Sequence, residues 1–74
     1  MNIQYEKQVG RRIKLFREKI KMTQEQLSVN LQIKGCDITR SAVAKIEVGQ
    51  RHLYIDELKA VKEILGITFE ELLY

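Results

Sequence analysis

Apolar residues recur at helical spacing through most of this chain, and glycines separate the runs. The first run has steps of three and four residues and consists of Val9, Ile13, Phe16 and Ile20. This pattern predicts a helix over about residues 5–20 with these side chains facing inward. Gly10 lies inside that helix at a cost of about 1 kcal/mol relative to alanine. The cost is easier to explain if another helix passes close to Gly10.

Two short motifs predict the starts of later helices. In TQEQ the hydroxyl of Thr23 caps a new helix, and Gln26 reaches back to the backbone N–H of the cap, which makes a capping box. This helix is predicted to end near Ile33, with Gly35 as its stop. TFEE, which begins at Thr68, is a second capping box and opens a last short helix.

Two more helices are predicted between these motifs. Asp37 or Thr39 caps the first of them, and Gly49 ends it. The second lies in DELKAVKEILGI and stops at Gly66, with three side chains facing inward: Leu58, Val61 and Leu65. The chain is therefore predicted to be all-α, with five short helices and no strands.

The helix that precedes Gly49 has two different faces when it is drawn at about 100° per residue. One face suits packing and contains Ala42, Val43, Ile46 and Glu47. The other places basic residues around small ones and contains Arg40, Ser41, Ala44, Lys45 and Val48. Such a face fits the major groove of DNA, where the guanine O6 and N7 atoms accept hydrogen bonds from basic side chains. The alternative is an ordinary solvated face.

A carboxylate on the packing face needs a partner, because an unpaired buried charge is costly. The carboxylate belongs to Glu47, and the basic residue best placed to meet it is Arg17, at the edge of the inward stripe of the first helix. A bidentate pair would fasten the two helices together. Spacing alone leaves open the alternative that both side chains point to water.

Charge is distributed unevenly along the 74 residues, which are predicted to form one domain (residues 1–74) with a modest core. Residues 1–21 carry seven Lys or Arg against two acidic residues, whereas residues 53–74 carry two against five. A basic face on a small domain suggests a polyanionic partner. A charged surface that is merely solvated is the alternative.

Composition also narrows the classes of function. Cys36 and His52 are the only cysteine and histidine, so neither an enzyme nor a metal or other cofactor is expected. Cys36 is interpreted as an ordinary loop residue, with a redox switch through an intermolecular disulfide as the alternative. A lone cysteine favours a reducing, cytoplasmic setting. No apolar run approaches the roughly 20 residues of a membrane span.

Taken in order, the motifs TQEQLSVNL, ITRSAVAKIEVGQR and LGITFEEL resemble the helix-turn-helix domain of the lambda-repressor/Cro-like (XRE-type) family of bacterial and phage regulators. The resemblance runs from about Val9 to Leu72. It implies a five-helix lambda-repressor-like fold and a transcriptional regulator, in particular a repressor, that binds double-stranded DNA sequence-specifically. It further implies a homodimer on a palindromic operator. The alternative is a protein-interaction module of the same fold, such as an antitoxin or an adaptor.

The resemblance also implies roles for individual residues. The base-reading positions are Arg40, Ser41, Ala44 and Lys45. The positions that hold the DNA backbone or cap the helices beside it are Thr23, Gln24, Thr39, Gln50 and Arg51. Arg17 and Glu47 match a salt bridge of the family, and Ser28 matches the small residue where the two central helices touch.

Relatives often dimerise near the last helix, whose apolar end consists of Phe69, Leu72, Leu73 and Tyr74. For Phe69 and Leu72 the alternative is that they complete the core of the monomer. The chain departs from the family at three places, one of which is His52 and Leu53, where the family often has proline. The segment QIKGCDI makes the central turn about five residues longer than the tight version. Lys21 stands where a glycine often ends the first helix, which predicts a left-handed lysine or a different ending.

Overall fold

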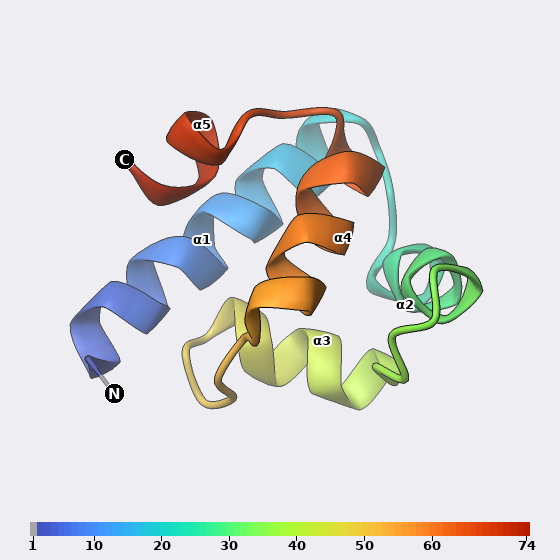
Figure 1. Cartoon of the computed structure of the whole chain (residues 1–74), viewed down its shortest axis with the longest axis horizontal. Helices are drawn as coiled ribbons and strands as arrows, with labels where there is room; N and C mark the ends of the chain where they lie inside the picture. The colour runs from blue at the N-terminus through green and yellow to red at the C-terminus, as the bar shows by residue number, and fades with distance from the viewer. Residues whose placement is uncertain (1) are drawn as a thin grey trace.

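The computed structural model describes residues 2–74, and these form five helices with no strand among them (Figure 1). The helices are α1 (Ile3–Lys19), α2 (Gln24–Ile33), α3 (Arg40–Glu47), α4 (Ile55–Leu65) and α5 (Phe69–Leu73). Figure 1 shows α1 and α4 in the middle, with α3 on one side and α5 on the other. The prediction of an all-α chain with five short helices is confirmed.

Both predicted capping boxes are present. Thr23 Oγ1 accepts from the backbone N–H of Gln26 at 3.0 Å, and Gln26 Oε1 accepts from the backbone N–H of Thr23 at 2.8 Å. Thr68 and Glu71 exchange the same two bonds at the start of α5, each at 3.0 Å. These bonds satisfy backbone donors that the first turn of a helix leaves without partners.

For other helix ends, the sequence pattern leaves the cap undecided or predicts a different position. The cap of α3 is Thr39 rather than Asp37, since its Oγ1 accepts from the N–H of Ala42 at 3.2 Å. α1 begins before Tyr5, because the Asn2 side chain caps it. The prediction that Ile20 faces inward is wrong: it lies just past the end of α1 and is 50% exposed.

One hydrophobic core joins all five helices and the turn between α2 and α3. Its buried members are Val9, Ile13, Leu27, Leu31, Cys36, Ile38, Val43, Ile46, Ala60, Val61, Leu65 and Leu72. α1 crosses α3 closely at Gly10, where an added Cβ would lie 2.2 Å from the carbonyl oxygen of Ile46 and 2.8 Å from that of Glu47. The expectation that another helix passes close to Gly10 is therefore confirmed.

The predicted dimer contact at the end of the chain has to be corrected at Leu72. Its side chain is 0% exposed and belongs to the core, so it is not available to a second copy. Phe69 is 43% exposed and Tyr74 86% exposed, whereas Leu73 is partly buried. α5 is held on α1 because the two terminal nitrogens of Arg12 donate to the carbonyl oxygens of Leu72 and Tyr74, at 3.4 and 3.2 Å.

The lengthened turn between α2 and α3 is anchored from inside. Cys36 and Ile38 both extend into the core, and Ile38 is fully buried. Ser28 Oγ in α2 donates to the carbonyl oxygen of Ile38 at 2.7 Å, which ties the turn to the helix before it. The extra residues therefore add core side chains, and α2 and α3 still pack directly on each other.

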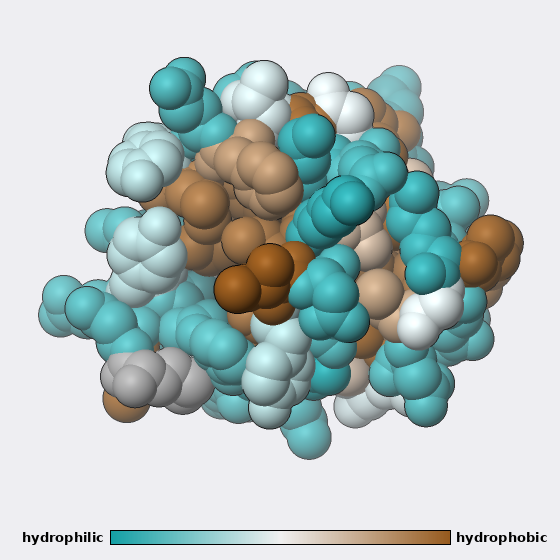
Figure 2. Space-filling view, viewed as in Figure 1, coloured by the Kyte–Doolittle hydropathy of each residue, from teal (hydrophilic) through white to brown (hydrophobic). Residues whose placement is uncertain are grey.

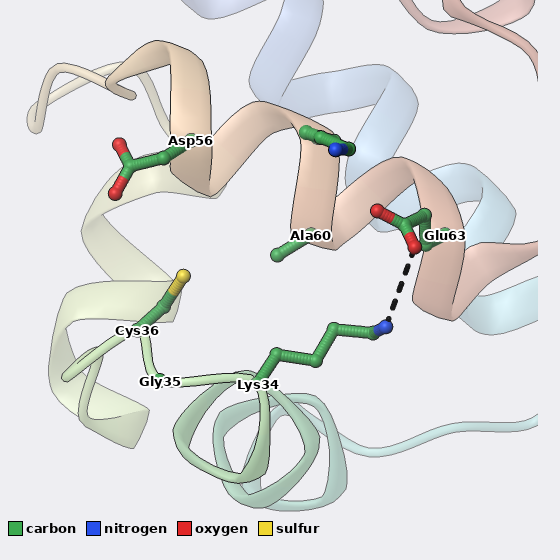
Figure 3. Close-up of a pocket in the computed structure, with 7 residues that line it drawn as sticks. Lys34, Gly35, Cys36, Asp56, Ala60 and Glu63 are labelled. Atoms are coloured by element: carbon green, nitrogen blue, oxygen red, sulfur yellow. Dashed lines mark ion pairs between the residues drawn. The ribbon is translucent and has the colours of Figure 1, made fainter.

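Cys36 lies in this turn, as predicted, but its side chain is buried and belongs to the core. Burial raises the pKa of its thiol, which keeps it protonated and poorly reactive. The turn faces α4 across a hollow of about 290 Å³, into which the side chains of Cys36 and Ala60 point (Figure 3). Lys34 and Glu63 form an ion pair across this hollow at 3.5 Å.

Lys21 adopts the left-handed conformation, with φ at 57°. This conformation costs a residue with a Cβ about 1–2 kcal/mol, whereas glycine adopts it freely. We expect Lys21→Gly to raise the free energy of unfolding by about 0.5–1 kcal/mol, after allowing for the greater freedom of glycine in the unfolded chain. Urea denaturation measures the change. Lys21→Ala removes the same charge but keeps the Cβ, so a gain of equal size in Lys21→Ala would contradict the backbone explanation.

Candidate nucleic-acid interface

α3 turns its basic face away from the core. Arg40, Ser41 and Lys45 are exposed, and Ala44 lies partly exposed between them. None of the ion pairs formed by residues 2–74 involves Arg40 or Lys45. Their charges are therefore available to a ligand, and the small side chains beside them leave room for a close approach.

The opposite face of α3 is fixed by Glu47, and the pair that spacing left open is present. Arg17 Nε donates to Glu47 Oε2 at 2.6 Å, and Arg17 Nη2 donates to Oε1 at 3.1 Å. The two residues are 7% and 5% exposed, so the pair lies inside the protein. The hydrogen bond to Glu47 is the main reason why the pKa of Arg17 is raised, and the guanidinium stays charged. Arg17 Nη1 also donates to the carbonyl oxygen of Met22, at 2.7 Å.

Gln24 joins the same carboxylate, which the sequence did not reveal. Its Nε2 donates to Glu47 Oε1 at 3.0 Å. Because Gln24 is the first residue of α2, a single carboxylate links α1, α2 and α3. One amide hydrogen and the Oε1 atom of Gln24 are not used in this bond, so a contact with DNA does not require breaking it.

The other residues expected at the DNA backbone lie at the ends of α2 and α3. Thr23 accepts the capping bond through Oγ1, so its hydroxyl hydrogen is still free to donate. Thr39 caps α3. Gln50 is exposed, and its backbone N–H donates to the carbonyl oxygen of Lys45 at 2.8 Å. That bond closes α3 where Gly49 takes the left-handed conformation, with φ at 78°.

Arg51 has a structural partner that the sequence analysis missed. Its Nη1 and Nη2 donate to the two carboxylate oxygens of Glu57, at 2.9 and 3.0 Å. Nη1 also donates to the carbonyl oxygen of His52 at 3.0 Å. The pKa of Glu57 is lowered, chiefly by the bond from Arg51, so the pair is fully charged at neutral pH. These bonds leave the Nε hydrogen and one Nη2 hydrogen of Arg51 for a ligand.

The candidate residues therefore fall into two groups. The base-reading set lies on α3, and the backbone set lies at the start of α2 and at the two ends of α3. The proposed dimer residues of α5 are elsewhere, on the other side of α1 and α4 (Figure 1). Within residues 2–74, no three His, Cys, Asp or Glu side chains gather where a metal ion would bind. None of the described helices has the length and apolar character needed to cross a membrane.

A family model described as helix-turn-helix matches residues 13–72, which include α2, α3 and α4, the second part of α1 from Ile13, and all of α5 except Leu73. The chain belongs to the Cro/C1-type helix-turn-helix family. Members of this family are DNA-binding domains and not enzymes. In this chain the helix-turn-helix consists of α2, the lengthened turn and α3.

A solved structure supports the same fold for this helix-turn-helix chain. The chain is similar to the crystal structure of the DNA-binding domain of BldD, with a TM-score of 0.81 and 20% sequence identity. The similarity covers 100% of both chains, so the lengthened turn does not prevent the helices from taking that arrangement. Among curated proteins, none matches the chain.

Proposed function

We propose that this helix-turn-helix domain is a transcriptional regulator, acting as a repressor in the cytoplasm, that reads a palindromic operator as a homodimer. The observation that carries the proposal is the outward face of α3, where Arg40, Ser41 and Lys45 surround Ala44 without competing ion pairs. Placed in the major groove, these donors reach the O6 and N7 atoms of guanine. The capped start of α2, Gln50 and Arg51 then hold the phosphate backbone and set the register.

The rigid support behind this face favours the same function. The Glu47 carboxylate holds α1, α2 and α3 together through Arg17 and Gln24. A helix held in this way keeps its backbone in position before it meets DNA, so less freedom is lost on binding. Rigid positioning of α3 is what sequence reading requires, because base contacts tolerate little displacement.

A surface on the α1, α4 and α5 side is suited to a second copy of the chain. Apolar side chains gather there around a hollow of about 180 Å³ (Figure 2). The hollow is lined by Tyr5, Glu6, Val9, His52, Leu53, Leu58 and Leu73. Exposed tyrosine and apolar residues, typical of interfaces, also occur on these elements: Tyr54, Ile55, Phe69 and Tyr74. In a two-fold dimer, the two α3 helices would meet half-sites about 34 Å apart.

Selection from a random duplex library tests the proposal. The purified chain is bound to the library at moderate salt, and the retained duplexes are sequenced. We expect enrichment of a two-fold symmetric motif whose half-sites are about one turn apart. An asymmetric motif would remove the dimer, and binding without any motif would remove the reading role of α3.

Arg40→Ala is expected to weaken binding to the selected operator by about 1–3 kcal/mol and to relax the preference at one base pair of each half-site. The reason is that its guanidinium is free to bond one guanine bidentately. Titration of operator and random duplexes measures both effects. Gln50→Ala is the matched control, since loss of a backbone contact weakens all duplexes alike. Equal losses on both duplexes for Arg40→Ala would contradict a reading role.

The same apolar surface supports a second candidate function, a protein-interaction module such as an antitoxin or an adaptor. The surface extends beyond α5 to Leu53, Leu58 and the exposed Ile55, which is more than a helix end alone provides. Contiguous apolar surface of this kind marks interaction sites. DNA binding that is weak, and that is not strongly reduced by salt, would favour this function over the regulator.

A further inference from the structure

A basic groove lies beside α3, outside the residues proposed above to contact DNA. It has a volume of about 300 Å³ and is lined by Lys7, Arg11, Lys14, Glu47 and Val48. The three basic residues are spaced by four and three positions, so they form one stripe along α1. We call them the α1 stripe.

The charge of the α1 stripe is not balanced within the protein. No ion pair among the described residues includes Lys7, Arg11 or Lys14. The one carboxylate in the groove is that of Glu47, and both of its oxygens accept hydrogen bonds from Arg17 or Gln24. Like charges at these helical spacings destabilise a helix by about 0.2–0.5 kcal/mol per pair. A bound anion would remove this repulsion.

The α1 stripe is fixed relative to α3 by close backbone contacts. Gly10, within the stripe segment, lies against the carbonyl oxygens of Ile46 and Glu47. On the next turn towards the start of α1, the backbone of Lys7 lies against Gly49, where an added Cβ would be 2.9 Å from the Lys7 Cα. The stripe and the reading face therefore move together.

The position of Val48 shows which way the groove opens. Val48 follows the last residue of α3 and is 54% exposed, on the same face as Arg40, Ala44 and Lys45. It is also a wall of the groove. The basic groove is therefore continuous with the C-terminal end of the reading face. When α3 lies in the major groove, this end is close to the DNA strand that borders the groove.

We propose that the α1 stripe binds the phosphate backbone of the DNA strand bordering the major groove that α3 enters. This inference rests on the proposed function, because it needs α3 in that groove. The stripe adds affinity and salt dependence but no base preference, since phosphates carry no sequence information. It also gives the basic first part of the chain a defined partner.

Salt-dependent titration of a duplex by matched triple variants tests the inference. One variant replaces Lys7, Arg11 and Lys14 by glutamine. The control replaces Lys34, Lys59 and Lys62 by glutamine as well, so it loses the same number of positive charges, at the end of α2 and on α4. For the stripe variant we expect about tenfold weaker binding or more, and a plot of log affinity against log salt that is less steep by about 2–3. The control should change the slope by less than about 1. Arg11→Gln alone should show a smaller change in the same direction.

The outcomes separate this inference from the proposed function. Equal changes in the two triple variants would overturn the local contact and leave only an effect of net charge. An unchanged slope in the stripe variant, while the wild-type chain still enriches a motif, would overturn the contact and leave the operator reader standing. Absence of salt-dependent duplex binding by the wild-type chain would overturn both. Circular dichroism of each variant confirms that it is folded.

Discussion

Arg17→Ala is expected to lower the free energy of unfolding by about 3–5 kcal/mol, because it leaves the carboxylate of Glu47 buried without its main partner. Glu47 is 5% exposed and receives two of its hydrogen bonds from Arg17. The change also removes the bond from Arg17 Nη1 to the carbonyl oxygen of Met22. For a small domain with a total stability of about 5–15 kcal/mol, this is a large fraction. Urea denaturation followed by circular dichroism measures it.

Two comparison variants show whether burial of the pair is the cause. Arg51→Ala breaks a more exposed pair with Glu57 and is expected to cost about 1 kcal/mol or less. Arg17→Met combined with Glu47→Leu removes both charges and should recover much of the stability, since apolar replacements avoid the cost of burying charge. If Arg17→Ala and Arg51→Ala lost equal amounts, the Glu47 carboxylate would have to be better solvated than the structure indicates.

Gly10→Ala is expected to cost about 2–3 kcal/mol of stability, although alanine favours a helix by about 1 kcal/mol relative to glycine. The new Cβ would lie 2.2 Å from the carbonyl oxygen of Ile46, so α1 and α3 would have to separate. Because the obstacle is backbone, no side-chain rotation relieves it. Gln8→Ala, at an exposed position of α1, is the control and should be nearly neutral.

The same substitution is expected to weaken operator binding beyond the loss of folded protein. Displacing α3 from α1 shifts Arg40 and Lys45 relative to α2, and misplaced donors lose base contacts. Titration at a temperature where Gly10→Ala is still folded separates the two effects. A variant that keeps full stability would show that the helices can move apart at little cost.

Local chemistry made much of the fold predictable. The capping boxes at Thr23 and Thr68 and the helix stops at Gly35, Gly49 and Gly66 each depend on a few neighbouring residues. All of them are found in the structure, where the three glycines are left-handed. The cap at Asn2 was missed because the apolar run begins later, at Val9. Ile20 was misplaced because apolar spacing continues past the point where α1 ends.

Contacts between distant residues were harder to predict. The pair of Arg17 and Glu47 followed from the cost of a buried carboxylate together with the family resemblance. The bonds from Gln24 to Glu47 and from Arg51 to Glu57 depend on the packing of helices, which spacing along the chain does not reveal. The burial of Cys36 was missed for the same reason, since it depends on α4 covering the turn.

The two faces of α3 have a consequence for how such a regulator can change in evolution. The face that holds the fold together contains Val43, Ile46 and Glu47, and the outward face that is proposed to read bases does not share these residues. Arg40 and Lys45 form no ion pair within the described chain, so replacing them removes little stability. If this face reads bases as proposed, new operators are accessible through single substitutions that leave the protein above its folding threshold. The same separation makes this helix a convenient scaffold for selecting altered DNA specificity in the laboratory.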